Sequence, residues 1–154
     1  MKKLTVKYQD SKFRIISDEK LYGEIIFDEN NIDASLHISN KILRAEKGPD
    51  KNIELRNNNK TLFKFVFDYI WGGAEISSNG EDTGFDIKGR WFRPGTRLTD
   101  KDDKDLIIAV KKNDGLHVSI LDENIAEEMV LATIYYHLYS SRGKMLAVII
   151  GSVS

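Results

Sequence analysis

Short runs in which apolar and polar residues alternate fill the first 120 residues of the chain. Every second residue is apolar in 32–38, and the pattern returns in 53–56, 63–67 and 116–120. Successive side chains of a strand point to opposite faces, so this alternation predicts half-buried strands. Further short apolar runs predict additional strands at 4–8, 13–16, 21–27, 41–45, 71–77, 84–88 and 106–111.

Turn-forming residues separate these runs, at 28–31, 48–50, 57–59, 78–80 and 113–115. The pairs Asn79-Gly80 and Asp114-Gly115 are the strongest hairpin signals among them. Pro49 and Pro94 fall outside the alternating runs, and the isolated glycines at 72–73, 84 and 89 indicate bulges or barrel corners. Many short strands at regular spacing predict a barrel or a sandwich.

The pattern changes to that of a helix over about residues 124–141. Asp122 or Asn124 is a candidate N-cap, Glu127 and Glu128 suit the first turn, and a following Arg-Gly pair at 142–143 suits the end. The apolar residues between them cover nearly the whole circumference at a period of 3.6. A helix that is apolar all round must be buried all round or lie in a membrane.

A flat sheet would cover only one side of such a helix, so the sheet must curl around it. We therefore predict a single domain over residues 1–154, mostly β, with a closed or nearly closed antiparallel barrel around one buried C-terminal hydrophobic helix. The final apolar run, 145–150, reads as one more buried strand or as a continuation of the core.

Composition narrows the class of protein. Lys and Arg number 23 against 24 Asp and Glu, a net charge of −1, which argues against a dedicated nucleic-acid binder. The absence of cysteine excludes disulfides, thiolate catalysis and Cys-ligated zinc. Charged residues interrupt any signal-peptide pattern near the N-terminus, and no uninterrupted apolar stretch is long enough for a spanning helix. We expect a cytoplasmic protein, peripheral to the membrane at most.

One stretch of the chain is similar to a known superfamily. It comprises Phe85-Asp86-Ile87-Lys88-Gly89-Arg90-Trp91, Leu98-Thr99-Asp100, the strands 106–110 and 116–120, and the apolar helix at 129–134. This order resembles the tubby-like superfamily, in particular its LURP-one-related and phospholipid scramblase-like branch. The resemblance implies about twelve strands around a central helix, and some members bind phosphoinositides or membrane surfaces. No phosphoinositide-binding residue of a member is matched to a position here.

The densest basic stretch comprises Lys88, Arg90, Arg93 and Arg97, interleaved with the aromatic pair at 91–92. Guanidinium groups suit bidentate phosphate contacts, and the aromatics could anchor at an interface. The alternative is an ordinary solvated surface, with the arginines paired to nearby acids such as Asp86, Asp100 and Asp102, and the aromatics in the core or at an edge.

Other candidate sites are weaker. Four carboxylates within 100–105 could hold Ca²⁺, but the glycine and glutamate of an EF-hand loop are missing, which favours a polar turn. His37, His117 and His137 lack metal-ligand spacing, and the tyrosines 135, 136 and 139 read as core. Phosphate-loop and nucleophile-elbow motifs are absent from the sequence. We expect no cofactor, no metal and no enzymatic activity.

The sequence therefore favours a non-enzymatic binding or scaffold module. It would recognise anionic phospholipid or phosphoinositide headgroups, or a protein partner, through the outer surface of the barrel. The alternative is a carrier of a small hydrophobic ligand with a lipocalin-like cavity. The position of the helix decides between the binding module and the carrier, since a helix inside the lumen leaves no room for a ligand.

Overall fold

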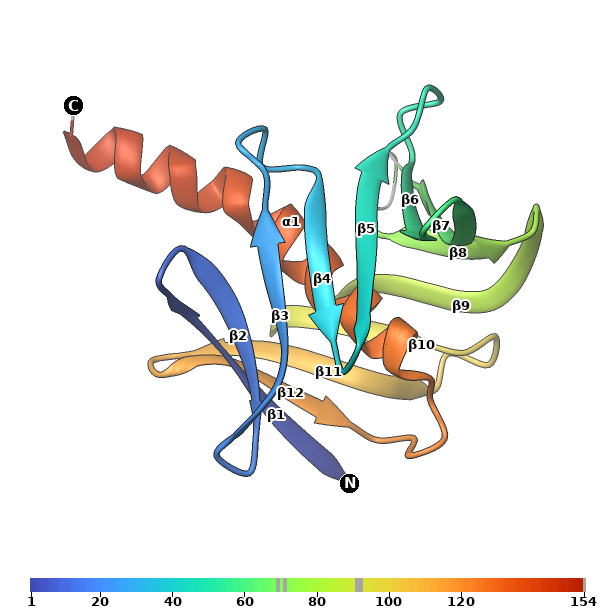
Figure 1. The fold of residues 1–154 in the computed structure, drawn as a ribbon, viewed down its shortest axis with the longest axis horizontal. Coiled ribbons are helices and arrows are strands. Elements are labelled where there is room, and N and C mark those ends of the chain that lie inside the picture. The colour runs from blue at the N-terminus through green and yellow to red at the C-terminus, as the bar shows by residue number, and fades with distance from the viewer. Residues whose placement is uncertain (69, 71, 91–92, 154) are drawn as a thin grey trace.

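The computed structural model shows twelve strands closed into a barrel, with one helix, α1, passing through the lumen (Figure 1). The structure describes residues 1–68, 70, 72–90 and 93–141 and the backbone of 142–153. The strand order confirms the predicted closed antiparallel barrel around a C-terminal helix.

The strands follow one another around the barrel in chain order, and β1 closes the sheet by pairing with β12. All pairs are antiparallel, as short turns between consecutive strands require. The strands are β1 (Lys2–Gln9), β2 (Lys12–Ser17), β3 (Lys20–Phe27), β4 (Ala34–Ile38), β5 (Lys41–Lys47), β6 (Ile53–Asn57), β7 (Lys60–Phe67), β8 (Ala74–Ser78), β9 (Glu81–Arg90), β10 (Arg93–Thr99), β11 (Asp105–Lys112) and β12 (Gly115–Ile120).

Alternation places the apolar residues of each strand in the lumen. In β4, Ala34, Leu36 and Ile38 are buried while Ser35 and His37 are partly exposed. A shift of one residue in register would turn every one of these side chains to the solvent, so the apolar face fixes the pairing. Closure also leaves no exposed sheet edge.

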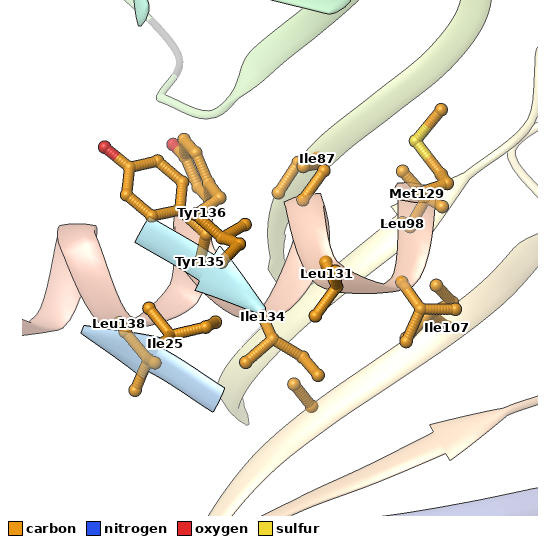
Figure 2. Packing of buried hydrophobic residues seen from close by; sticks show 14 of the residues in the cluster. Ile25, Ile87, Leu98, Ile107, Met129, Leu131, Ile134, Tyr135, Tyr136 and Leu138 are labelled. Carbon is orange, nitrogen blue, oxygen red and sulfur yellow. The ribbon is translucent and has the colours of Figure 1, made fainter. Parts of the chain in front are cut away.

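The helix α1 (Glu127–Val153) is surrounded by the barrel over its N-terminal part. Residues 129–136, more than two turns, are all buried, and Leu131, Ile134 and Tyr135 are fully so. Figure 2 shows these side chains among Ile25, Ile87 and other lumen residues contributed by different strands. The all-round apolar pattern is thus explained by a sheet that surrounds the helix.

Both predicted limits of the helix are wrong. The carbonyl of Ala126 accepts the amide of Val130, so α1 begins after Ala126, and Asp122 instead orders the preceding turn by accepting the amide of Asn124. At the other end α1 continues through Arg142 and Gly143 to Val153. A glycine costs a helix only about 1 kcal/mol relative to alanine, and the four residues that follow it, 144–147, are good helix formers. The strand interpretation of 145–150 is therefore wrong.

The strand β10 is missing from the alternation pattern because it contains Pro94, Gly95 and two arginines. The register with β9 shifts between Arg93 and Thr96, which leaves Pro94 and Gly95 in a bulge. Pro94 therefore lies within a strand, contrary to prediction. Gly95 has a φ of 126° and a Cβ there would lie 2.7 Å from the Ala109 carbonyl oxygen, so only glycine fits.

The meander gives the barrel two distinct rims. The turns β1–β2, β3–β4, β5–β6, β7–β8, β9–β10 and β11–β12 lie at one rim, and the other turns lie at the opposite rim. Because α1 follows β12, it enters at the opposite rim, where Lys41 contacts Glu128 at 2.8 Å. It leaves at the rim that carries the β3–β4 turn, where the Tyr135 hydroxyl donates to the Ile32 carbonyl at 2.6 Å. We call the rim at which α1 enters the opposite rim, and the rim at which it leaves the exit rim.

Candidate anion-binding site at the exit rim

The predicted basic residues lie on one hairpin formed by β9 and β10. Ile87 and Leu98 pair across it and point into the lumen, so their neighbours Lys88 and Arg97, which also pair, point outward. Arg90 and Arg93 form the last pair before the exit rim. Trp91 and Phe92, the aromatics of the predicted stretch, lie outside the described residues, as does Trp71.

Lys88 and Arg97 are already neutralised. The Lys88 ammonium lies 2.7 Å from Asp103, and the Arg97 guanidinium contacts Asp103 at 3.1 Å and Asp105 at 2.6 Å. The hydrogen bond from Lys88 lowers the pKa of Asp103. The expected partners Asp86, Asp100 and Asp102 are not the ones used, and burial raises the pKa of Asp86. These two cations serve the hairpin rather than a ligand.

Arg90 and Arg93 differ from them. Among the described residues, neither makes an ion pair, and the contact that Arg90 makes is a 3.4 Å hydrogen bond to the Pro94 carbonyl. Arg93 is exposed and Arg90 partly so. Like charges directly opposite each other on a sheet are destabilising, so the pair holds two positive charges together without a neutralising carboxylate in the described chain. This arrangement is suited to an anion.

The acidic cluster at 100–105 forms a polar turn. The Asp100 carboxylate accepts the backbone amides of Asp102 and Lys104, and Asp103 and Asp105 bind the basic residues of the hairpin. In the part of the chain that the structure describes, no three His, Asp or Glu residues gather as metal ligands would.

The three histidines lie apart. His37 is on β4 and His117 on β12, and these strands are separated by β1, β2 and β3 around the barrel. His117 contacts Asp114 at 2.6 Å on the surface, while the Nδ1 atom of His137 lies 2.7 Å from the Thr96 hydroxyl. The structure does not bring His37 and His117 together.

The three tyrosines of the helix, 135, 136 and 139, belong to or pack against the core, as predicted. Tyr135 stacks against Phe27 and Phe65, and Tyr136 against Phe67. Burial raises the pKa of both tyrosines. They hold α1 in the lumen, where the carrier alternative would place its ligand.

A surface hollow of about 680 Å³ lies at the opposite rim beside the start of α1. Its lining includes Lys2, Asp18 and Glu127, and therefore both signs of charge. Lys2 lies over the ring of Tyr22, 4.4 Å from its centre, and burial together with Glu127 and Glu128 raises the pKa of Tyr22 to about 12. The hollow is outside the lumen and has no set of side chains selective for one kind of ligand.

The exit rim also carries an apolar residue that the alternation pattern does not identify. Ile70, in the turn between β7 and β8, is 85% exposed. Its neighbours in the chain are Tyr69 and Trp71. The glycine pair at 72–73, two residues after Ile70, indicates a turn and could have suggested this exposure. The strand β8, which follows this turn, pairs with β9, which ends at Arg90.

Comparison with protein-family models, curated proteins and solved structures finds no match in any of the three. The resemblance to the tubby-like superfamily therefore stays a prediction. The class that the structure defines is a closed twelve-stranded barrel with a helix in its lumen. In the described part of the chain, no helix combines the length and apolarity needed to cross a membrane.

Proposed function

We propose that the protein is a non-enzymatic module that binds the surface of anionic membranes through the exit rim, with Arg90 and Arg93 contacting lipid phosphates. The observation that carries this proposal is the cross-strand pair of arginines without an ion-pair partner among the described residues. Arginine matches phosphate with two parallel hydrogen bonds, and its planar group keeps this geometry.

The surrounding charges support this choice of ligand. Two carboxylates at the exit rim are already paired with cations: Asp28 contacts Arg44 at 2.8 Å, and Asp50 binds Lys64. Both contacts lower the pKa of the carboxyl group, so these acids stay ionised and paired at neutral pH. They therefore oppose an approaching anionic surface less than free carboxylates would.

The pair of arginines gives a measurable but modest affinity. A basic residue close to an anionic leaflet contributes about 1 kcal/mol, so two contribute about thirtyfold in binding. The effect weakens as salt screens the charges, over a Debye length of about 8 Å at physiological ionic strength.

The test compares two double variants in sedimentation with phosphatidylserine-containing vesicles. The variant R90Q/R93Q removes the cross-strand pair. The control K20Q/K60Q removes the same charge from the opposite rim, where both lysines are exposed and without ion pairs among the described residues. We expect about thirtyfold weaker binding for R90Q/R93Q and little change for the control.

Equal losses of vesicle binding in the two variants would show that net charge alone governs binding, and would refute the assignment of the site to Arg90 and Arg93. Failure of the unmodified protein to sediment with anionic vesicles would overturn the membrane function and leave a protein partner as the alternative.

A further inference from the structure

The path of α1 sets which part of the chain lies beyond the exit rim. The last described contacts inside the barrel are those of His137 with Thr96, at the start of β10, and of Tyr139 with Phe67, at the end of β7. Both strand ends are at the exit rim. The helix then continues to Val153, and its C-terminal part projects past the strands (Figure 1).

The sequence of this projecting segment changes character along its length. Arg142 and Lys144 come first, and six consecutive apolar residues follow at 145–150. Basic residues followed by an apolar segment match the order in which a chain entering a membrane meets lipid headgroups and then acyl chains. The nine residues 145–153, at 1.5 Å per residue, reach about 13 Å, close to the thickness of one hydrocarbon leaflet, about 15 Å.

Two further features lie at the same rim. Ile70 is exposed there, and Arg90 and Arg93 form their pair there. Two cations alone give weak binding, and stable attachment to a membrane generally takes a second, apolar signal. The apolar segment of α1 and the exposed Ile70 provide such a signal on the side of the molecule that carries the arginines.

We infer that the exit rim faces the membrane and that the segment 142–153 of α1 enters the lipid interface as an anchor, with the β7–β8 turn beside it. This inference rests on the proposed membrane function, and deepens it by fixing the orientation of the barrel. The arginines and the anchor then act together, because one surface carries both. A second copy of this chain as the partner of the segment is the competing outcome.

The absence of cysteine allows single-site labelling without background. We would attach an environment-sensitive fluorophore to Ile149→Cys in the segment, Ile70→Cys in the β7–β8 turn and Asn79→Cys in the β8–β9 turn at the opposite rim. On anionic vesicles we expect a blue shift and quenching by nitroxide lipids at positions 149 and 70, and neither at 79.

Vesicle binding with positions 149 and 70 still in water, or with 79 responding instead, would overturn the orientation and leave the proposed function standing. A blue shift at 149 that depends on protein concentration and needs no vesicles would assign the segment to a second copy. Absence of sedimentation would instead overturn the proposed function itself.

A charge-matched pair of variants gives an independent readout. L146E/I149E places two acids in the segment, whereas L21E/I42E places two at the opposite rim, where the side chains are 59% and 56% exposed. Because transfer of each large apolar side chain is worth about tenfold or more, we expect more than about tenfold weaker binding for L146E/I149E than for L21E/I42E. Equal binding of the two variants would refute the anchor.

Discussion

Replacing Ile134 tests the placement of α1 in the lumen. Ile134 is fully buried in the middle of the helix and lies among lumen side chains from the surrounding strands (Figure 2). Ile134→Asp puts a carboxyl group where the surroundings are apolar. It loses the packing of the isoleucine and also requires burial of a polar or charged group.

The loss of unfolding free energy expected for Ile134→Asp has two parts. Truncation in a core, as in Ile134→Ala, costs about 2–5 kcal/mol through lost transfer energy and the cavity left behind. The aspartate adds several kcal/mol more, whether it stays ionised or takes up a proton. A chain of 154 residues has a free energy of unfolding of about 8–23 kcal/mol. Ile134→Ala should therefore fold with reduced stability, and Ile134→Asp should approach or cross the limit of folding.

Chemical denaturation followed by circular dichroism measures both variants. The control is Ile42→Asp, the same chemical change at a side chain that is 56% exposed, which should change the unfolding free energy by at most about 0.5 kcal/mol. A soluble Ile134→Asp variant with cooperative unfolding and the stability of the control would refute a helix inside the barrel.

Two further predictions concern single contacts of α1. Lys41 lowers the pKa of Glu128 below its ordinary value of 4.5, so their contact stabilises the protein above that pH and the contribution is lost as pH falls through the lowered pKa. Glu128→Gln should accordingly be less stable than the unmodified protein at pH 7, with the difference shrinking towards pH 3 in denaturation curves. Tyr135→Phe removes the hydroxyl that donates to the Ile32 carbonyl and should cost about 1–2 kcal/mol in thermal or chemical unfolding. A variant as stable as the unmodified protein would show that water replaces this bond without loss.

Local patterns predicted most of the strands because alternation reports directly which face of a strand is buried. The same logic failed for β10, whose lumen-facing Thr96 is polar and whose Pro94 and Gly95 sit in a bulge. Nothing in a periodic pattern encodes a bulge, because the bulge is set by the neighbouring strand, here by the close approach of the Ala109 carbonyl to Gly95.

The end of the helix and the partners of the basic residues were harder to predict. An Arg-Gly pair permits a helix to stop but does not force it, and α1 continues to Val153. The pairing of Lys88 and Arg97 with Asp103 and Asp105 depends on how the turn after β10 folds back over the hairpin. Sequence alone places these acids nearby but does not choose among neighbouring carboxylates.

The central functional claim is recognition of an anionic membrane surface. It is tested most directly by sedimenting the unmodified protein with neutral and with anionic vesicles, at low and at physiological salt. Our account predicts binding to the anionic vesicles that weakens as salt rises, and much weaker binding to the neutral ones. Equal binding to both compositions, or no binding to either, would contradict it.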